Sequence, residues 1–124
     1  ERDLDAYFRF MPFTDNVAGA IKGLDVVVMP SLWESCGLLA MEALTCGTPL
    51  IGTNCIGLRE VLKNTPASIS KSRDAGSLSK AIERELLHPT KSLQSAFSNT
   101  AALRFDAKSR SLKIQALYAL MQKP

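Results

Sequence analysis

Residue types that mark several common functions are scarce in this sequence of 124 residues. Aromatic residues make up 6% of it and are not interleaved with Lys and Arg, which argues against nucleic-acid binding. The three cysteines and one histidine show no metal-ligand spacing, so we predict no metal site. No apolar run reaches the length that spans a bilayer, and we expect no signal peptide.

The composition is typical of a soluble globular domain, with 46% hydrophobic residues, 22% charged residues and a net charge of +3. The length suits one domain. The cysteines, Cys36, Cys46 and Cys55, are odd in number and fit a reducing compartment, so we predict a cytoplasmic protein. Because the first residue is Glu1 and not Met, we expect a fragment, that is, a single truncated domain over residues 1–124.

Short apolar runs alternate with helical patterns along the chain. The clearest strand, 26–29, is three-quarters β-branched, which is typical of a strand covered on both faces. Further strands are predicted over 7–11, 50–52 and 67–70, and helices over 16–22, 37–45, 58–62 and 75–87. This alternation predicts an α/β fold in which helices flank a parallel sheet of about four strands, connected by right-handed crossovers.

The last part of the chain, 90–124, forms a helical tail in this prediction, with the helical pattern running over 90–122 and bending near Phe105 and Asp106. Its apolar stripe consists of Leu112, Ile114, Ala116, Leu117 and Leu120. Because an apolar stripe on a helix is normally buried, we expect this tail to pack back on the domain.

The turn between strand 26–29 and helix 37–45 lies at the carboxyl ends of the strands, where open α/β sheets bind ligands. Backbone N–H groups at the start of a helix are unpaired and attract anions. The amides of Gly37, Leu38 and Leu39 are therefore a candidate phosphate site. The alternative is a tight structural turn capped by Ser35. We expect Trp33 to anchor this turn in the core, with stacking on a base or a sugar as the alternative.

Two carboxylates belong to the same region. Glu34 lies just before the helix and can accept hydrogen bonds from hydroxyl groups or stabilise positive charge; the alternative is a capping or solvated acid. Glu42 is the only ionisable residue of helix 37–45, which is apolar nearly all round and is therefore expected to be buried. A buried carboxylate needs partners, either vicinal hydroxyls such as those of a ribose or a salt bridge to Arg59 or a Lys.

Several motifs lie in register between Asp25 and Leu62. Seven residues separate the two glutamates, and the surrounding elements are Pro30-Ser31, Gly37-Leu38, Glu42-Ala43, Cys46-Gly47-Thr48-Pro49, and then Gly57, Glu60 and Val61. In this combination the stretch resembles the donor-binding core of retaining GT-B glycosyltransferases of family four, the group 1 glycosyltransferases. The resemblance implies a Rossmann-like C-terminal domain of that fold.

The resemblance also implies roles for individual residues. Glu34 would lie at the donor sugar in the reaction centre, and Glu42 would bind the ribose hydroxyls. The amides of Gly37, Leu38 and Leu39 would hold the diphosphate, and Ser35 and Cys36 complete the predicted donor-binding turn. The reaction implied is transfer of a sugar from a UDP- or GDP-sugar to an acceptor hydroxyl with retention, without a metal or other cofactor. The acceptor would be a glycan or a lipid-linked molecule, bound through an N-terminal domain, and the parent enzyme would be cytoplasmic or membrane-peripheral.

The sequence also departs from the family pattern. Ser35 and Cys36 precede a single glycine where two glycines are common, and Ile56 stands where the family often has another glycine. The strands that normally precede segment 7–11 are missing upstream of Glu1. We therefore expect a rearranged sheet, a strand docked at a new edge, or an oligomer that covers the exposed edge. The alternatives for function are a non-catalytic α/β nucleotide-binding or interaction module, and an enzyme like glycogen or starch synthases or like sugar epimerases.

Overall fold

A three-stranded parallel sheet forms the centre of the molecule. The structure is a computed structural model that describes residues 4–121. The strands are β1 (Val27–Met29), β2 (Leu50–Thr53) and β3 (Ser68–Ser70), in the order β1-β2-β3. Val28 lies opposite Ile51, and Gly52 lies opposite Ile69. The central strand β2 is buried along its whole length because both faces of the sheet carry helices.

Six α-helices and one short 3₁₀ helix surround or extend this sheet in the described part of the chain. They are η1 (Asp5–Tyr7), α1 (Val17–Lys22), α2 (Leu38–Cys46), α3 (Leu58–Leu62), α4 (Ala75–Leu87), α5 (Lys91–Arg104) and α6 (Ala107–Met121). Two of them begin at side-chain caps: Oδ1 of Asn16 accepts the N–H of Gly19, and the carboxylate of Asp74 accepts the N–H of Ser77. The predicted helix 75–87 and the predicted helix 58–62 are confirmed at both ends.

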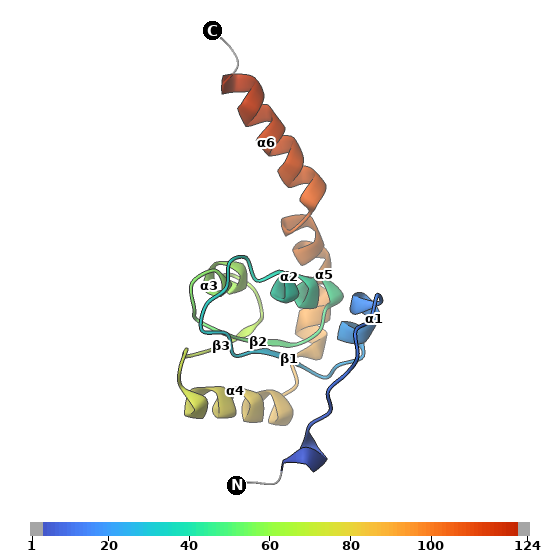
Figure 1. Ribbon diagram of the computed structural model, residues 1–124, viewed down its shortest axis with the longest axis vertical. Coiled ribbons are helices and arrows are strands. Elements are labelled where there is room, and N and C mark those ends of the chain that lie inside the picture. The colour runs from blue at the N-terminus through green and yellow to red at the C-terminus, as the bar shows by residue number, and fades with distance from the viewer. Residues whose placement is uncertain (1–3, 122–124) are drawn as a thin grey trace.

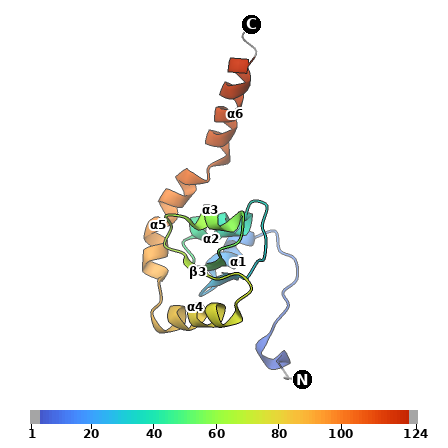
Figure 2. The ribbon, with the colours of Figure 1, turned by 90° about the vertical axis from the view of Figure 1, so that its left-hand side faces the viewer.

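The helices form two layers on the sheet. Figures 1 and 2 show α1, α2 and α3 on one face and α4 on the opposite face, while α5 runs beside α2 at the end of the sheet. Ala40, Ala43 and Leu44 of α2 pack into the same core as Leu50, Leu58 and Leu62. The predicted α/β architecture with a parallel sheet is thus confirmed, with three strands rather than four.

The missing fourth strand is the predicted strand 7–11. In the structure, residues 8–16 form no regular element, and the side chains of Tyr7, Phe8, Phe10 and Met11 are all exposed. The prediction was wrong because apolar and aromatic composition favours a strand only where another strand is available for pairing. Nothing in the described chain lies beside this segment to supply that ladder of hydrogen bonds.

The C-terminal tail is helical, with the predicted bend at Phe105, but its two helices differ in packing. Helix α5 lies against α2 and buries Gln94 and Ala101. Helix α6 has no buried residue and projects away from the domain, as Figures 1 and 2 show. The expected packing of the apolar stripe therefore holds for neither Leu112 nor Leu117, and Gln122 lies outside the described residues.

The corner between α4 and α5 is fixed by a buried carboxylate. Glu85 is 6% exposed, and its Oε1 accepts the backbone N–H of Thr90 at 2.7 Å. The hydroxyl of Thr90 also donates to this carboxylate, at 3.0 Å. Because Thr90 precedes the first residue of α5, Glu85 sets the direction in which α5 leaves the corner.

Among the helices of residues 4–121, none combines the length and the apolar character that a membrane span requires.

Candidate functional site

The turn that joins β1 to α2 is held in place by hydrogen bonds from its neighbours. The hydroxyl of Ser31 donates to Oε1 of Glu34 at 2.8 Å. The hydroxyl of Thr53, at the end of β2, donates to the backbone carbonyl of Ser31. Glu34 is half-buried, and its Oε2 receives no hydrogen bond from the described residues. The turn thus fixes one carboxylate oxygen and leaves the other accessible at the carboxyl end of the sheet.

The next loop, between β2 and α3, packs directly on this turn. The N–H of Glu34 donates to the carbonyl of Ile56 at 3.2 Å. Gly57 has φ +83°, and a Cβ on it would overlap with the carbonyl group of Glu34. Only glycine satisfies both this backbone conformation and this close approach. The glycine that the sequence analysis matched to the family pattern therefore positions Glu34.

Helix α2 begins immediately after the turn, at Gly37. Gly37 is buried and has φ +65°, and a Cβ there would lie 3.3 Å from Leu58 Cδ1. The backbone N–H groups of the next two residues, Leu38 and Leu39, have no acceptor among the described residues. Unpaired amides in the first turn of a helix attract anions. The first turn of α2 therefore offers two amides to an anionic ligand.

The other residues of the turn are accessible to solvent. Ser35 and Cys36 are exposed, and helix α2 has no side-chain cap, so the alternative of a turn capped by Ser35 is not realised. Trp33 is 67% exposed, and the expectation that it anchors the turn in the core was wrong. The turn is held instead by the backbone contacts of Glu34 with Ile56 and Gly57, which the sequence pattern does not reveal.

Glu42 lies one turn into α2, on the side of the helix that faces solvent. It is exposed, as is Leu38 of the same helix, so the prediction that the whole helix is buried was wrong. The apolar residues of α2 divide into a buried face and an exposed face. Glu42 makes no salt bridge within the described residues, and the alternative partner Arg59 pairs with Glu60 instead.

The exposed face of α2 forms one wall of a hollow of about 480 Å³. The opposite walls come from the start of α1 and from the bend between α5 and α6. The hollow is lined by Asp15, Asn16, Val17, Ala18, Leu38, Met41, Glu42, Thr45, Cys46 and Phe105. The contribution of Asp15, Asn16 and Phe105 was not predicted, because these residues are distant in sequence and carry no local motif.

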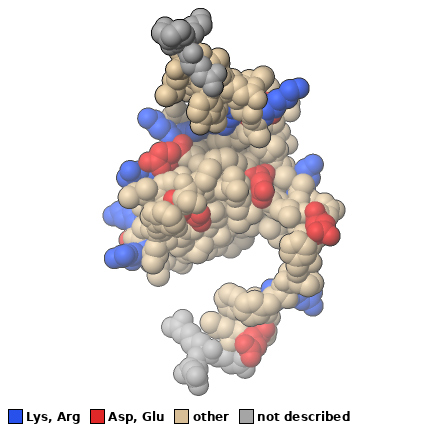
Figure 3. Space-filling model, turned by 45° about the horizontal axis from the view of Figure 1, so that its top comes forward, with Lys and Arg blue, Asp and Glu red and all other residues tan. Residues whose placement is uncertain are grey.

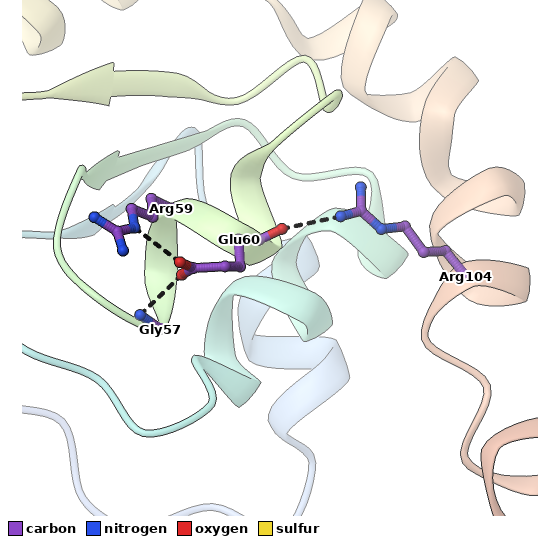
Figure 4. A network of polar contacts seen from close by, with 4 residues as sticks. All are labelled: Gly57, Arg59, Glu60 and Arg104. Atoms are coloured by element: carbon purple, nitrogen blue, oxygen red, sulfur yellow. Dashed lines mark hydrogen bonds and ion pairs between the residues drawn. The ribbon is translucent and has the colours of Figure 1, made fainter.

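A second hollow of about 400 Å³ adjoins the start of α2 and is lined by Cys36 and Leu38 together with residues of α3, α5 and α6. Figure 4 shows the network beside it. Glu60 accepts the N–H of Gly57 at 3.0 Å and pairs with Arg59 Nε at 2.8 Å. Arg104 donates to the carbonyl of Glu60 at 3.1 Å. The hydrogen bond from Arg59 is the main reason that the pKa of Glu60 is lowered.

Glu60 thereby holds the loop that supports Glu34, since its carboxylate caps α3 at Gly57. In the described residues, no group of three or more His, Cys, Asp or Glu side chains is arranged as a metal site. The site consists of a turn with two unpaired amides, two accessible carboxylates, and an apolar hollow beside them.

A family model for glycosyl transferases group 1 matches residues 1–104. The chain belongs to this family. The D-inositol 3-phosphate glycosyltransferase of Paenarthrobacter aurescens (strain TC1) is 48% identical over 49 residues, which are 40% of this chain and 12% of that protein. The 2-deoxystreptamine N-acetyl-D-glucosaminyltransferase of Streptomyces fradiae is 40% identical over 73 residues, 58% of this chain and 17% of that protein.

Among solved structures, the glycosyltransferase domain resembles Anabaena HepE, which was crystallised in complex with UDP. The TM-score is 0.84 at 20% sequence identity, and the match covers 94% of this chain and 33% of HepE. This likeness confirms the fold. The group 1 domain therefore spans a third of the length of this neighbour, and less than a fifth of the length of the two curated relatives.

Proposed function

We propose that this group 1 domain binds the donor of a glycosyltransferase reaction, a nucleotide diphosphate sugar whose sugar is transferred to an acceptor hydroxyl with retention. The observation that carries the proposal is the placement of two unpaired amides, at Leu38 and Leu39, one turn before an accessible carboxylate, Glu42. A nucleoside diphosphate presents the matching groups in the same order, since its anionic phosphates adjoin a ribose with vicinal hydroxyls.

The diphosphate would bind at the start of α2. The N–H groups of Leu38 and Leu39 would donate to phosphate oxygens, and the positive end of the α2 dipole would add to the attraction. The backbone of Gly37 and the exposed residues Ser35 and Cys36 would border the phosphates. The complex of HepE with UDP supports uridine diphosphate as the nucleotide of the donor sugar. Guanosine diphosphate is the alternative nucleotide in this proposal.

The nucleoside would lie in the hollow beside α2. Glu42 lines this hollow, and a carboxylate accepts hydrogen bonds from two vicinal hydroxyls of a ribose. The volume of about 480 Å³ lies within the range of roughly 300–1,000 Å³ that small-molecule sites occupy. Asn16 and Phe105, which line the other walls of this hollow, would contact the base.

Glu34 would act at the donor sugar. Ser31 holds Oε1, so Oε2 is free to accept a hydrogen bond from a sugar hydroxyl or to stabilise the positive charge that develops at the anomeric carbon. Because the turn is braced by Ile56 and Gly57, this carboxylate would be positioned before the donor binds. No metal or other cofactor takes part in this proposal.

The acceptor, a glycan or a lipid-linked molecule, would be bound by a further domain, and transfer activity is proposed for the whole protein rather than for this chain. We propose a cytoplasmic enzyme that can contact the membrane surface for lipid-linked acceptors. We assign donor binding alone to this chain because it spans only a third or less of the length of these relatives.

Isothermal titration of the chain with UDP, GDP and UDP-sugars tests the proposal. We expect Glu42→Ala to weaken binding of the nucleotide roughly 10- to 100-fold, as expected for loss of a charge-assisted pair of hydrogen bonds. Glu34→Gln should weaken UDP-sugar binding more than UDP binding. Glu83→Ala, an exposed carboxylate on α4, is the matched control. If neither glutamate variant weakens binding, the alternative of a non-catalytic interaction module is favoured.

A further inference from the structure

One arginine at the end of α5 holds the C-terminal end of α3. Nη1 of Arg104 donates to the carbonyl of Lys63 at 2.8 Å, and Nη2 donates to the carbonyl of Glu60 at 3.1 Å. Figure 4 shows the bond to Glu60 crossing from α5 to α3. A planar guanidinium that binds two carbonyls fixes their direction as well as their distance. Arg104 therefore determines how the end of α3 sits against α5.

Helix α3 depends on such an external contact because it is short. It has five residues, and a helix leaves its last four carbonyls without partners inside the helix. Leu58, Val61 and Leu62 are buried, but apolar packing has no preferred direction and tolerates a small tilt of the helix. The two hydrogen bonds from Arg104 supply that direction. The positive charge also suits the negative end of the helix dipole.

The other end of α3 supports the turn that contains Glu34. Gly57 is the N-cap of α3 and donates its N–H to Oε2 of Glu60 at 3.0 Å. A Cβ on Gly57 would overlap with the Glu34 carbonyl, and the N–H of Glu34 donates to Ile56 at 3.2 Å. Five helical residues span only about 7.5 Å. A tilt of α3 at the Arg104 end therefore displaces the loop on which Glu34 rests.

We propose that Arg104 is a positioning residue for Glu34. Through the carbonyl of Glu60 and through α3, it sets the place of the carboxylate that would act at the donor sugar. The inference rests on the proposed function of Glu34. Arg104 does not line the hollow that contains Glu42, so it acts on the donor sugar through Glu34 and not as a contact of the nucleoside.

The contacts of Arg104, rather than a local excess of charge, identify it. On the face of the molecule in Figure 3, Lys and Arg side chains are interspersed with Asp and Glu. Arg104 differs from an exposed arginine such as Arg84 of α4 because it is half-buried and bridges two elements that are distant in sequence. Arg84→Lys is therefore a matched control for Arg104→Lys.

The substitution Arg104→Lys removes the bridge and keeps the charge. A lysine ammonium cannot reproduce the planar fork that holds both carbonyls. The guanidinium of Arg104 also lies 5.0 Å from the centre of the Phe105 ring, and Phe105 lines the hollow beside Glu42. A lysine retains a cation for this ring. The variant thus tests the link to Glu34 with little change to the hollow.

Isothermal titration measures the effect on donor binding. UDP-glucose, UDP-N-acetylglucosamine and GDP-mannose are the probes, and the one that the unmodified chain binds most tightly is compared with its free nucleotide. Arg104→Lys should raise the dissociation constant of that donor roughly fivefold to tenfold, a typical effect of one lost hydrogen bond. The dissociation constant of the free nucleotide should change by less than about twofold. Arg84→Lys should leave both unchanged.

The double variant Glu34→Gln/Arg104→Lys separates positioning from a general structural effect. If Arg104 acts through Glu34, its substitution has nothing further to disturb once the Glu34 carboxylate is gone. The double variant should then bind the donor within about twofold of Glu34→Gln alone. Additive losses in the double variant would overturn the proposal.

Hydrogen exchange by NMR tests the same link without any nucleotide. The N–H of Glu34 is bonded to Ile56 in the loop, whereas the N–H of Val27 is bonded to Pro49 beside the sheet. Arg104→Lys should speed exchange at Glu34 roughly tenfold and at Val27 by less than about twofold, because local opening affects only the loop. A general loss of stability would speed both amides alike.

Two exchange results contradict the positioning role: an unchanged rate at Glu34, or equal acceleration at Glu34 and Val27. If the unmodified chain binds none of the three donors, the proposed function fails instead. The exchange rates then still decide whether Arg104 holds Glu34 in place, so the two failures are distinguishable.

Discussion

Gly57 and Glu34 lie so close together that no residue other than glycine fits at position 57. A Cβ on Gly57 would overlap with the Glu34 carbonyl oxygen and lie 2.8 Å from its carbonyl carbon. The two residues belong to loops at the ends of adjacent strands, β1 and β2. The position of the Glu34 carboxylate therefore depends on a residue that makes no contact with a donor in our proposal.

Replacing Gly57 by Ala should harm both stability and binding. We expect a loss of about 2–4 kcal/mol in the free energy of unfolding, because the Cβ meets backbone and φ is +83°. Urea denaturation measures this loss, and titration with a UDP-sugar should show weaker binding. Gly76→Ala is the matched control: it lies in the first turn of α4 with 3.4 Å to the nearest atom and should stabilise by about 0.5–1 kcal/mol. Equal effects of the two substitutions would contradict the role of Gly57.

The Arg59–Glu60 pair should give the loop a dependence on pH. The pKa of Glu60 is lowered, first by the hydrogen bond from Arg59 and also by the N–H of Gly57. A lowered pKa in the folded state means that the stabilisation is complete above the unfolded pKa and is lost as pH falls through the folded pKa. Carbon-13 NMR titration of the Glu60 carboxyl should show this, with Arg59→Ala returning the pKa toward its ordinary range. An unchanged titration in Arg59→Ala would assign the lowering to other groups.

Glu85 should matter more for stability than any exposed carboxylate on its helix. Glu85→Ala leaves the N–H and hydroxyl of Thr90 without their acceptor, which should cost about 2–3 kcal/mol in the free energy of unfolding. Glu83→Ala, two residues earlier and exposed, should change it by less than about 0.5 kcal/mol. Denaturant unfolding of both variants decides the matter, and similar losses would show that the α4–α5 corner does not depend on Glu85.

Removal of α6 should leave the domain intact. A chain ending at Asp106 loses a helix without buried residues, so its free energy of unfolding should change by less than about 0.5 kcal/mol. A chain ending at Thr90, which also loses α5, should be unfolded, because Gln94 and Ala101 are buried against the rest of the domain. Calorimetry of the two shortened chains tests this difference. A large drop in melting temperature on removal of α6 alone would reveal packing that the structure does not have.

The regular elements were predicted well wherever the local sequence determines them. Asp74 starts α4, and the β-branched run before Pro30 forms β1, because caps and periodicity act within a few residues. The predicted strand over residues 7–11 did not form, because strand pairing depends on a partner elsewhere in the molecule. Leu112 and Leu117 failed as core residues for the same reason, since an apolar stripe specifies burial but not the surface that buries it.

The candidate site was predicted in part. Glu34 and Gly37 lie in the turn that follows β1, as the topology of a parallel sheet indicated, and Glu42 lies in α2 and lines the hollow beside it. The burial of Glu42 was mistaken because apolar composition does not show that Leu38 and Leu39 face outward. The walls formed by Asn16 and Phe105 depend on how α1 and α5 pack against α2, and no local pattern encodes that packing.

The end of α2 away from the site rests on the backbone of α5. A Cβ on Gly47 would lie only 2.9 Å from Ser95 Cα, so these two helices meet without side chains between them. A helix of nine residues is about 13 Å long and moves as a rigid rod, so a shift at Gly47 is transmitted to the amides of Leu38 and Leu39. Random mutagenesis with selection for an altered donor preference should therefore yield substitutions at Ser95 and Ser98 of α5, as well as substitutions in the turn between β1 and α2.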